Sequence, residues 1–210
     1  MSKPNKVTKL AVIKSSAKAT SSSIKAHEAK KRLVFRPILE NPYTQSNVWP
    51  FIQPELGSDI VALLESLLKN PSPEVYRGFN QTVAALEKQA AYNRGKLSDP
   101  VPQIKYVFVC KFDISPAILT SMFPVLSVTA SRSADDMVKL VQLPRGSIEK
   151  LGDGIIGLTP NLERAKSLYD LVDEKVKDVD VPWLNGIFDK EVPFEVPKVK
   201  QIQTSVGAKK

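Results

Sequence analysis

Apolar residues at helical spacing alternate along the chain with short runs that have the composition of strands. Three amphipathic segments predict the main helices: one begins at a Ser58 cap, one covers roughly residues 80–92, and one begins at Leu162. Two shorter helices are predicted within residues 113–126 and from Ser147 onward. The central part of the chain is therefore rich in helix.

Three runs of β-branched and aromatic residues predict strands at 105–112, 137–144 and 154–158. The predicted strands alternate with the predicted helices, and a parallel or mixed sheet with helices on both faces is the usual result of that order. We therefore expect an α/β fold, a three-layer α/β/α sandwich around a small mixed sheet.

The two ends of the chain differ from the centre in composition. Residues 1–30 are too polar to offset the entropy of ordering, which predicts a disordered basic tail. Residues 31–57 mix large apolar groups with prolines and predict an extended arm, and residues 181–210 predict a second arm that continues into a basic tail. The α/β/α domain is then expected to cover residues 58–180.

Large apolar residues in the two arms lie outside the predicted domain. Such residues can mark a surface for another protein, although packing on the chain's own domain is an equal alternative. The candidates for protein contact are Trp49, Trp183, Leu184 and Phe188.

The net charge of +8 is concentrated at the two ends. The first 36 residues hold ten lysines and arginines against one acidic residue, and residues 198–210 add four lysines and no acid. Such ends suit a polyanion, because each cation placed on a phosphate releases a condensed counterion. A solubilising tail and a mitochondrial presequence are the alternatives. The cations next to the domain that we expect to contact RNA are Lys30, Lys31, Arg32 and Arg36.

The sequence offers few residues for catalysis or metal binding. Cys110 is the single cysteine and His27 the single histidine, which excludes an internal disulfide, a Cys/His zinc site and a histidine-assisted nucleophile on the domain. We expect Cys110 to be a small buried hydrophobe. Residues 152–157 spell G-x-G-x-x-G, but they follow a predicted helix and open a strand, the reverse of the dinucleotide-binding order.

No catalytic residue, metal, cofactor or small-molecule ligand is therefore predicted. The longest apolar runs are too short to cross a membrane and the N-terminus lacks the apolar centre of a secretory signal, so we expect a soluble intracellular protein without a membrane partner.

The start of the helix predicted at 80–92 has the features of an RNA contact. Gly78 lets another backbone approach closely, and the side chains of Asn80 and Gln81 can donate to and accept from a base edge. With Arg77 and the unpaired amides of the first helical turn, these groups could bind phosphate and recognise irregular base pairs. The alternative is a plain Gly/Asn helix cap.

The segment from RGFNQTVAALE through KYVFVCKF, VKLVQLP and RGSIEKLG resembles the kink-turn-binding domain of the archaeal and eukaryotic ribosomal-protein superfamily, over about Asp59 to Val179. Outside it, KKRLVFRPILENPYTQSNVWP and VPWLNGI resemble the fungal POP-family protein subunit of ribonuclease P and ribonuclease MRP, which carries this domain.

The superfamily recognises RNA with a helix start of the pattern glycine, any residue, asparagine, glutamate, and a lysine three residues later. Gly78 and Asn80 match this pattern, whereas Gln81 replaces the glutamate and Ala84 the lysine. The loop at 152–155 also lacks the superfamily's arginine. The helix start therefore has neither of the superfamily's two charged groups, so we expect a weaker RNA contact that operates inside an assembled particle.

The resemblance implies a non-catalytic protein subunit of the nuclear ribonuclease P and MRP particles, acting in precursor tRNA 5′ processing and ribosomal RNA processing, with the RNA as catalyst. It implies structured RNA and the other protein subunits as partners, and a nuclear and nucleolar location. The alternatives are a small nucleolar or ribosomal kink-turn protein, which would be expected to keep the glutamate and the lysine, and a protein-only scaffold whose basic tails are import signals.

Overall fold

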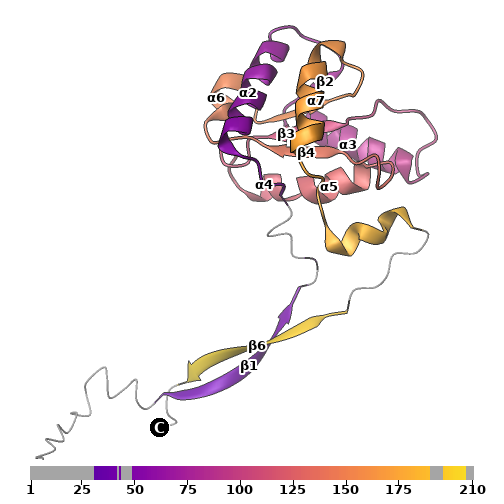
Figure 1. The fold of residues 1–210 in the computed structure, drawn as a ribbon. Coiled ribbons are helices and arrows are strands. Elements are labelled where there is room, and N and C mark those ends of the chain that lie inside the picture. The colour runs from indigo at the N-terminus through magenta and orange to yellow at the C-terminus, as the bar shows by residue number, and fades with distance from the viewer. Residues whose placement is uncertain (1–30, 42, 44–48, 190–195, 207–210) are drawn as a thin grey trace, which may run out of the picture. The chain divides into compact units, whose positions relative to one another are not determined.

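The computed structural model describes residues 31–41, 43, 49–189 and 196–206. The chain divides into two compact units, of which one comprises residues 1–41 and 197–210 and the other residues 42–196. The larger unit is a four-stranded sheet with helices on both faces, and the smaller contains a two-stranded antiparallel ribbon (Figure 1).

The sheet of the larger unit has the strand order β2-β5-β3-β4. Strands β3 and β4 are parallel, and β5 is antiparallel to both of its neighbours. The predicted small mixed sheet is confirmed, with β2 as an additional strand that is too short to give a periodic signal in the sequence. The strands are β2 (Val75–Arg77), β3 (Tyr106–Val109), β4 (Lys139–Gln142) and β5 (Ile155–Leu158).

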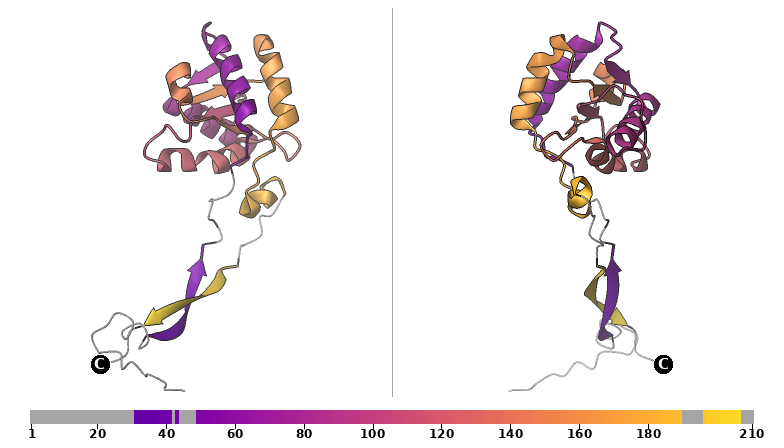
Figure 2. Two further views of the ribbon diagram at one scale, coloured as in Figure 1. Left: turned by 60° about the vertical axis from the view of Figure 1, so that its left-hand side comes forward. Right: turned by 90° about the vertical axis from the view of Figure 1, so that its right-hand side faces the viewer.

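Alternate side chains of β3 enter two different hydrophobic cores. Tyr106 and Phe108 pack on one side of the sheet, whereas Val107 and Val109 pack on the other. This alternation is the period of a strand buried on both faces, and it confirms the predicted three layers (Figure 2). The helices of the first side are α2 (Pro54–Leu68), α6 (Ser147–Leu151) and α7 (Lys166–Lys175), and those of the second side are α3 (Phe79–Asn93) and α5 (Phe123–Ala130).

Short helical segments complete the larger unit. A single turn, α4, comes before α5, and the 3-10 turn η1 comes before α7, close to the helix start predicted at Leu162. A second 3-10 helix, η2, follows α7. Their bounds are α4 (Ile118–Ser121), η1 (Glu163–Ala165) and η2 (Pro182–Phe188).

Helix α2 begins at Pro54, so the start predicted at Ser58 is wrong. Proline is favoured at the first helical position because its missing N–H would have no helical partner there. Ser58 lies inside the helix, where its hydroxyl donates to the Pro54 carbonyl at 3.1 Å. The helical domain thus includes the end of the segment expected to be an arm.

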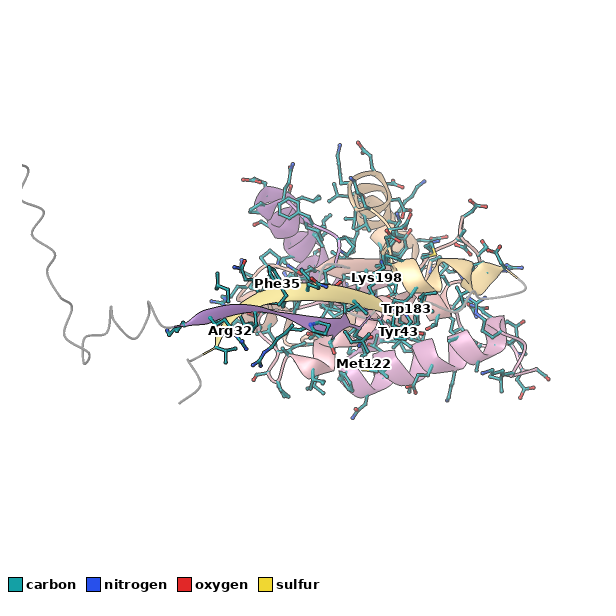
Figure 3. All side chains as sticks on the ribbon, turned by 90° about the horizontal axis from the view of Figure 1, so that it is seen from below. Arg32, Phe35, Tyr43, Met122, Trp183 and Lys198 are labelled. Carbon is teal, nitrogen blue, oxygen red and sulfur yellow. The ribbon has the colours of Figure 1, made fainter. Side chains whose placement is uncertain are left out.

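Residues of η2 and Trp49 pack on the second core of the larger unit. Leu184 in η2 is buried within that core, and Trp49, Trp183 and Phe188 are partly buried against it. Trp183 also meets the Tyr43 ring edge-to-face, with 5.1 Å between the ring centroids (Figure 3). For these four candidates the structure favours packing on the domain, the alternative that the sequence left open, and contact with another protein stays a prediction.

The smaller unit pairs the two ends of the chain. Strand β1 (Arg32–Glu40) runs antiparallel to β6 (Lys198–Val206), with Arg32 opposite Val206 and Glu40 opposite Lys198. The sequence predicted an extended arm over residues 31–57 and a second arm with a basic tail over residues 181–210, but not the pairing of β1 with β6, because no local pattern specifies a partner so distant in the chain. The basic tail predicted at 1–30 lies outside the described residues.

Cys110 is buried and unpaired, as predicted. Burial, assisted by the charge of Asp113, raises the pKa of its thiol to about 12. Within the described residues there is no helix long and apolar enough to span a membrane and no cluster of three His, Cys, Asp or Glu residues that could hold a metal ion.

Candidate nucleic-acid interface

Four loops meet at one edge of the sheet. Strands β2, β3 and β4 run in the same direction and β5 in the opposite one, so the loops that follow the first three and the loop that precedes β5 lie at the same edge. In open α/β sheets the carboxyl ends of the strands are the usual position of a binding site. We call this region the carboxyl edge; it comprises residues 77–81, 110–118, 143–148 and 151–154.

Backbone contacts hold the loops of the carboxyl edge together. The Cys110 amide donates to the Gly154 carbonyl at 2.8 Å. The Asp113 carboxylate accepts from the amides of Gly146 at 2.8 Å and Ile148 at 3.3 Å, which fixes the start of α6. The edge is therefore built around a carboxylate that is already used in holding the protein's own backbone.

The start of α3 is opened by Gly78, whose φ of 79° and ψ of 172° lie in a region that is almost restricted to glycine. Its amide donates to the Ile155 carbonyl at 2.8 Å and continues the pairing of β2 with β5. No side chain caps this helix. The glycine part of the cap alternative is therefore present, but Asn80 does not act as a cap.

Asn80 and Gln81 are both exposed at this helix start. The Gln81 side-chain oxygen accepts from the Arg77 amide at 3.3 Å, which leaves the side-chain nitrogen as the group to donate outward. Within the described part of the chain, the Asn80 side chain makes no hydrogen bond to protein. Asn80 thus offers both its donor and its acceptor.

Arg77 is tied to the loop before β5. Its Nε lies 2.6 Å from an Asp153 carboxylate oxygen, and one of its terminal nitrogens donates to the Leu151 carbonyl at 3.3 Å. Arg77, the residue predicted to contact phosphate, is therefore already paired with a carboxylate and joins two loops of the carboxyl edge. No pattern in the sequence indicates Asp153 as its partner, and only the fold brings the two residues together.

Further exposed residues, which no motif in the sequence marks, also belong to the carboxyl edge. Arg145 is exposed and has no ion pair among the described residues, and the side chains of Phe112 and Ile118 are 53% and 73% exposed. The Lys111 ammonium lies 4.9 Å from the ring centroid of Trp49 and 5.9 Å from that of Phe112, and burial lowers its pKa. An aromatic ring beside cations is the combination that proteins use to stack bases and hold backbone.

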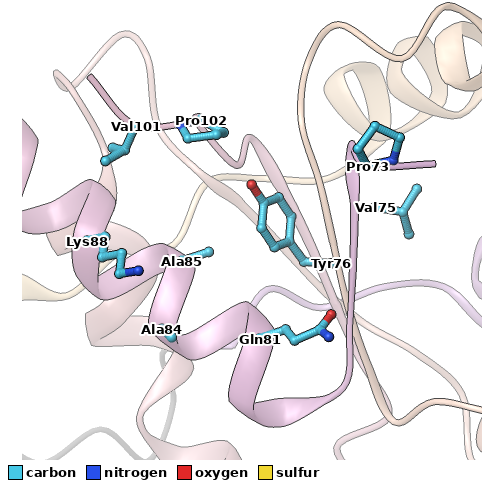
Figure 4. A pocket seen from close by; sticks show the side chains of 9 residues that line it. All are labelled: Pro73, Val75, Tyr76, Gln81, Ala84, Ala85, Lys88, Val101 and Pro102. Atoms are coloured by element: carbon cyan, nitrogen blue, oxygen red, sulfur yellow. The ribbon is translucent and has the colours of Figure 1, made fainter. Parts of the chain in front are cut away.

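A pocket of about 530 Å³ lies beside the first turns of α3 (Figure 4). Gln81 and Ala84, the two positions that depart from the superfamily pattern, are both in its wall. Because Ala84 and Ala85 are small, this side of the helix is open. The lining residues are Pro73, Val75, Tyr76, Gln81, Ala84, Ala85, Lys88, Val101 and Pro102.

Gly78→Ala is expected to lower the free energy of unfolding by about 1 to 3 kcal/mol, because a side chain is strained at this φ and ψ. The added Cβ would meet nothing nearer than an Asp153 oxygen at 4.0 Å, so the cost is one of backbone conformation. Urea unfolding followed by circular dichroism measures it. Asn80→Ala is the control, expected within about 0.5 kcal/mol of wild type; equal stabilities of all three proteins would contradict the argument.

The remaining predicted contacts lie in the smaller unit. Lys31, Arg32 and Arg36 are exposed at or within β1. Lys30 lies outside the described residues.

Comparison with known proteins agrees with the resemblance inferred from the sequence. The family model for the RNase P subunit Pop3 matches residues 30–186. The ribonucleases P/MRP protein subunit POP3 of Saccharomyces cerevisiae (strain ATCC 204508 / S288c) is 30% identical over 192 residues, which cover 85% of this chain and 89% of the yeast protein. The match includes the helix start, the carboxyl edge and most of η2, and it shows that this chain belongs to the RNase P subunit Pop3 family.

Proposed function

We propose that this chain is a non-catalytic, RNA-binding protein subunit of the nuclear ribonuclease P and MRP ribonucleoproteins, and that it supports precursor tRNA 5′ processing and ribosomal RNA processing. The observation that carries the proposal is the family match over residues 30–186, together with a relative that is a subunit of both ribonucleases. A nuclear and nucleolar location follows from the same proposal.

The carboxyl edge supports RNA as the ligand. Asn80 presents an unused amide, the Gln81 nitrogen is free to donate, and Gly78 adds no side chain that would keep a nucleotide away. The unpaired backbone amides of the first turn of α3 point out of the same helix start, and the N-terminus of a helix favours the binding of phosphate. Together these groups can bind backbone and base edges of a bent or looped RNA.

The pairing of Arg77 with Asp153 makes the contact weaker than a fully charged one. The carboxylate neutralises the guanidinium at 2.6 Å, and the neutral Gln81 stands where the superfamily has a glutamate. Both features favour a subunit that binds its RNA with help from neighbouring proteins over an autonomous kink-turn protein.

Exposed apolar residues support an assembly partner. Phe51 is 84% exposed, and Leu33, Phe35, Leu39 and Val199 of the β1–β6 ribbon are each more than 60% exposed. A contiguous group of exposed apolar side chains, such as those of the ribbon, often marks an interaction surface.

Asn80→Ala is expected to weaken binding to the ribonuclease P RNA, transcribed in vitro, by about 1 to 3 kcal/mol, or about 5- to 150-fold, because alanine has no amide to bind a base edge. Filter binding or fluorescence anisotropy at fixed salt measures it. Asn161→Ala is the matched control, since Asn161 is an exposed asparagine beyond the opposite end of β5, and it is expected to bind as wild type does.

Two results would separate the alternatives. Unchanged affinity of Asn80→Ala would remove the helix start from the RNA contact. Sequencing the RNA that copurifies with a tagged chain tests the particle: ribonuclease P and MRP RNAs are expected, small nucleolar or ribosomal RNAs would favour a kink-turn protein, and no RNA would favour a protein-only scaffold.

A further inference from the structure

The register of β1 with β6 sorts their side chains onto two faces. Residues directly opposite in an antiparallel pair lie on the same face, and successive residues of a strand alternate between faces. One face, which we call the charged face, comprises Arg32, Val34, Arg36, Ile38 and Glu40 of β1 with Lys198, Lys200, Ile202, Thr204 and Val206 of β6. The other, the uncharged face, comprises Leu33, Phe35, Pro37 and Leu39 with Val199, Gln201, Gln203 and Ser205.

All charges of the ribbon lie on one face. Arg32, Arg36, Lys198 and Lys200 are on the charged face with one acid, Glu40, and no residue of the uncharged face is ionisable. All four cations are exposed. Two segments from opposite ends of the chain thus contribute two cations each to the same surface.

Most of this positive charge is not neutralised within the protein. Lys200 lies 3.5 Å from Glu40, whereas Arg32, Arg36 and Lys198 have no ion pair in the described residues. Neighbouring rows of side chains on one face are about 7 Å apart along a strand. Arg36, Lys200 and Lys198 occupy three consecutive rows, so the cations form a line along the ribbon.

We propose that the charged face of the β1–β6 ribbon is a second RNA-binding site, which holds the sugar–phosphate backbone of a structured RNA and recognises no base. A line of exposed cations is complementary to a polyphosphate chain, and contacts of this kind position a protein without specifying sequence. The site rests on the proposed function of RNA binding, adds Lys198 and Lys200 to the RNA-contacting residues, and lies in a different unit from the carboxyl edge.

The low stability expected of an isolated two-stranded ribbon also favours a bound partner. A two-stranded sheet with no third strand is only marginally stable in water. Neutralising three unpaired cations on one face would remove their mutual repulsion and favour the paired register. A protein partner suits the uncharged face better, because apolar groups without charges are typical of the centre of protein interfaces.

The test moves charge between the faces of the full-length chain. One variant, Lys198→Gln with Lys200→Gln, removes two cations from the charged face. A second variant adds Gln201→Lys and Gln203→Lys to these changes, which restores the net charge but places it on the uncharged face. Binding to the in vitro transcribed ribonuclease P RNA is measured over a range of salt concentrations, with thermal unfolding as the check on folding.

The slope of log K against log salt is negative, and both variants are expected to reduce its magnitude by about 1.4 to 1.8. Each phosphate that is no longer neutralised reduces the magnitude by about 0.7 to 0.9. Wild-type binding by the second variant would mean that only net charge matters and would overturn the proposal. An unchanged slope in the first variant, or loss of a copurifying protein without loss of RNA affinity, would overturn it as well.

Glu40→Gln provides a result that misfolding cannot imitate. It frees Lys200 from its ion pair and removes the one acid of the charged face, so RNA affinity and the salt slope are expected to rise. A fall or no change would contradict the proposal. Absence of ribonuclease P and MRP RNA from the RNA that copurifies with the tagged wild-type chain would instead reject the proposed function, so the two hypotheses are tested separately.

Discussion

Replacing Leu184 with alanine is expected to lower the free energy of unfolding of this protein by about 2 to 5 kcal/mol. Leu184 is 7% exposed and belongs to the second hydrophobic core, so the truncation removes buried methyl groups and leaves a cavity. Its amide also donates to the Val181 carbonyl at 2.7 Å, a bond that closes the first turn of η2 and that alanine keeps. Urea unfolding followed by circular dichroism gives the difference.

Phe51→Ala is the matched control for this change. Phe51 lies in the other segment that the sequence presents as a proline-rich arm, yet its side chain is 84% exposed. Its truncation is expected to change stability by less than about 0.5 kcal/mol. If Leu184→Ala instead leaves stability unchanged while the other subunits no longer copurify, residues 182–188 serve as a partner surface and not as part of the core.

The sequence predicted the central layers because their signals are local. Residues 106–109 are β-branched or aromatic throughout, as expected for a strand buried on both faces. The helix at 79–93 follows Gly78, whose backbone conformation is one that glycine adopts readily and other residues do not. Strand β2 has three residues, which is less than two periods of alternation. A strand of that length has no pattern to detect.

Interactions between distant segments could not be predicted in the same way. The Arg77–Asp153 ion pair joins residues 76 positions apart, and nothing near either residue indicates the other. The pairing of β1 with β6 is a second case. One side of β6 carries Gln and Ser, so the strand has no continuous apolar face from which a pairing partner could be predicted. The candidate residues at the helix start were identified from type and spacing, but their engagement with Asp153 depends on the fold.

Gln89→Leu is expected to destabilise the protein by about 2 to 6 kcal/mol, about 1 to 3 kcal/mol for each buried polar group left without a partner. Gln89 is 3% exposed. Its amide nitrogen donates to the carbonyls of Ile104 and Ala130, each at 3.0 Å, and its oxygen accepts from the Ile104 amide at 2.7 Å. Leucine would orphan both backbone groups of Ile104, whereas the Ala130 carbonyl keeps its bond from Asn93 at 2.7 Å.

The same substitution at an exposed site of α3, Glu87→Leu, controls for the new side chain and is expected to change stability by less than about 0.5 kcal/mol. Because Gln89 fastens the later turns of α3 to Ile104, two residues before β3, while Asn80 lies exposed in its first turn, the two substitutions are expected to separate folding from RNA contact. Gln89→Leu should bind RNA as wild type does at temperatures where it is folded, whereas Asn80→Ala should unfold as wild type does and bind more weakly. A Gln89→Leu protein of wild-type stability would show that water replaces the missing amide, and a folded one with reduced affinity would show that the fastening also positions the RNA-binding end of the helix.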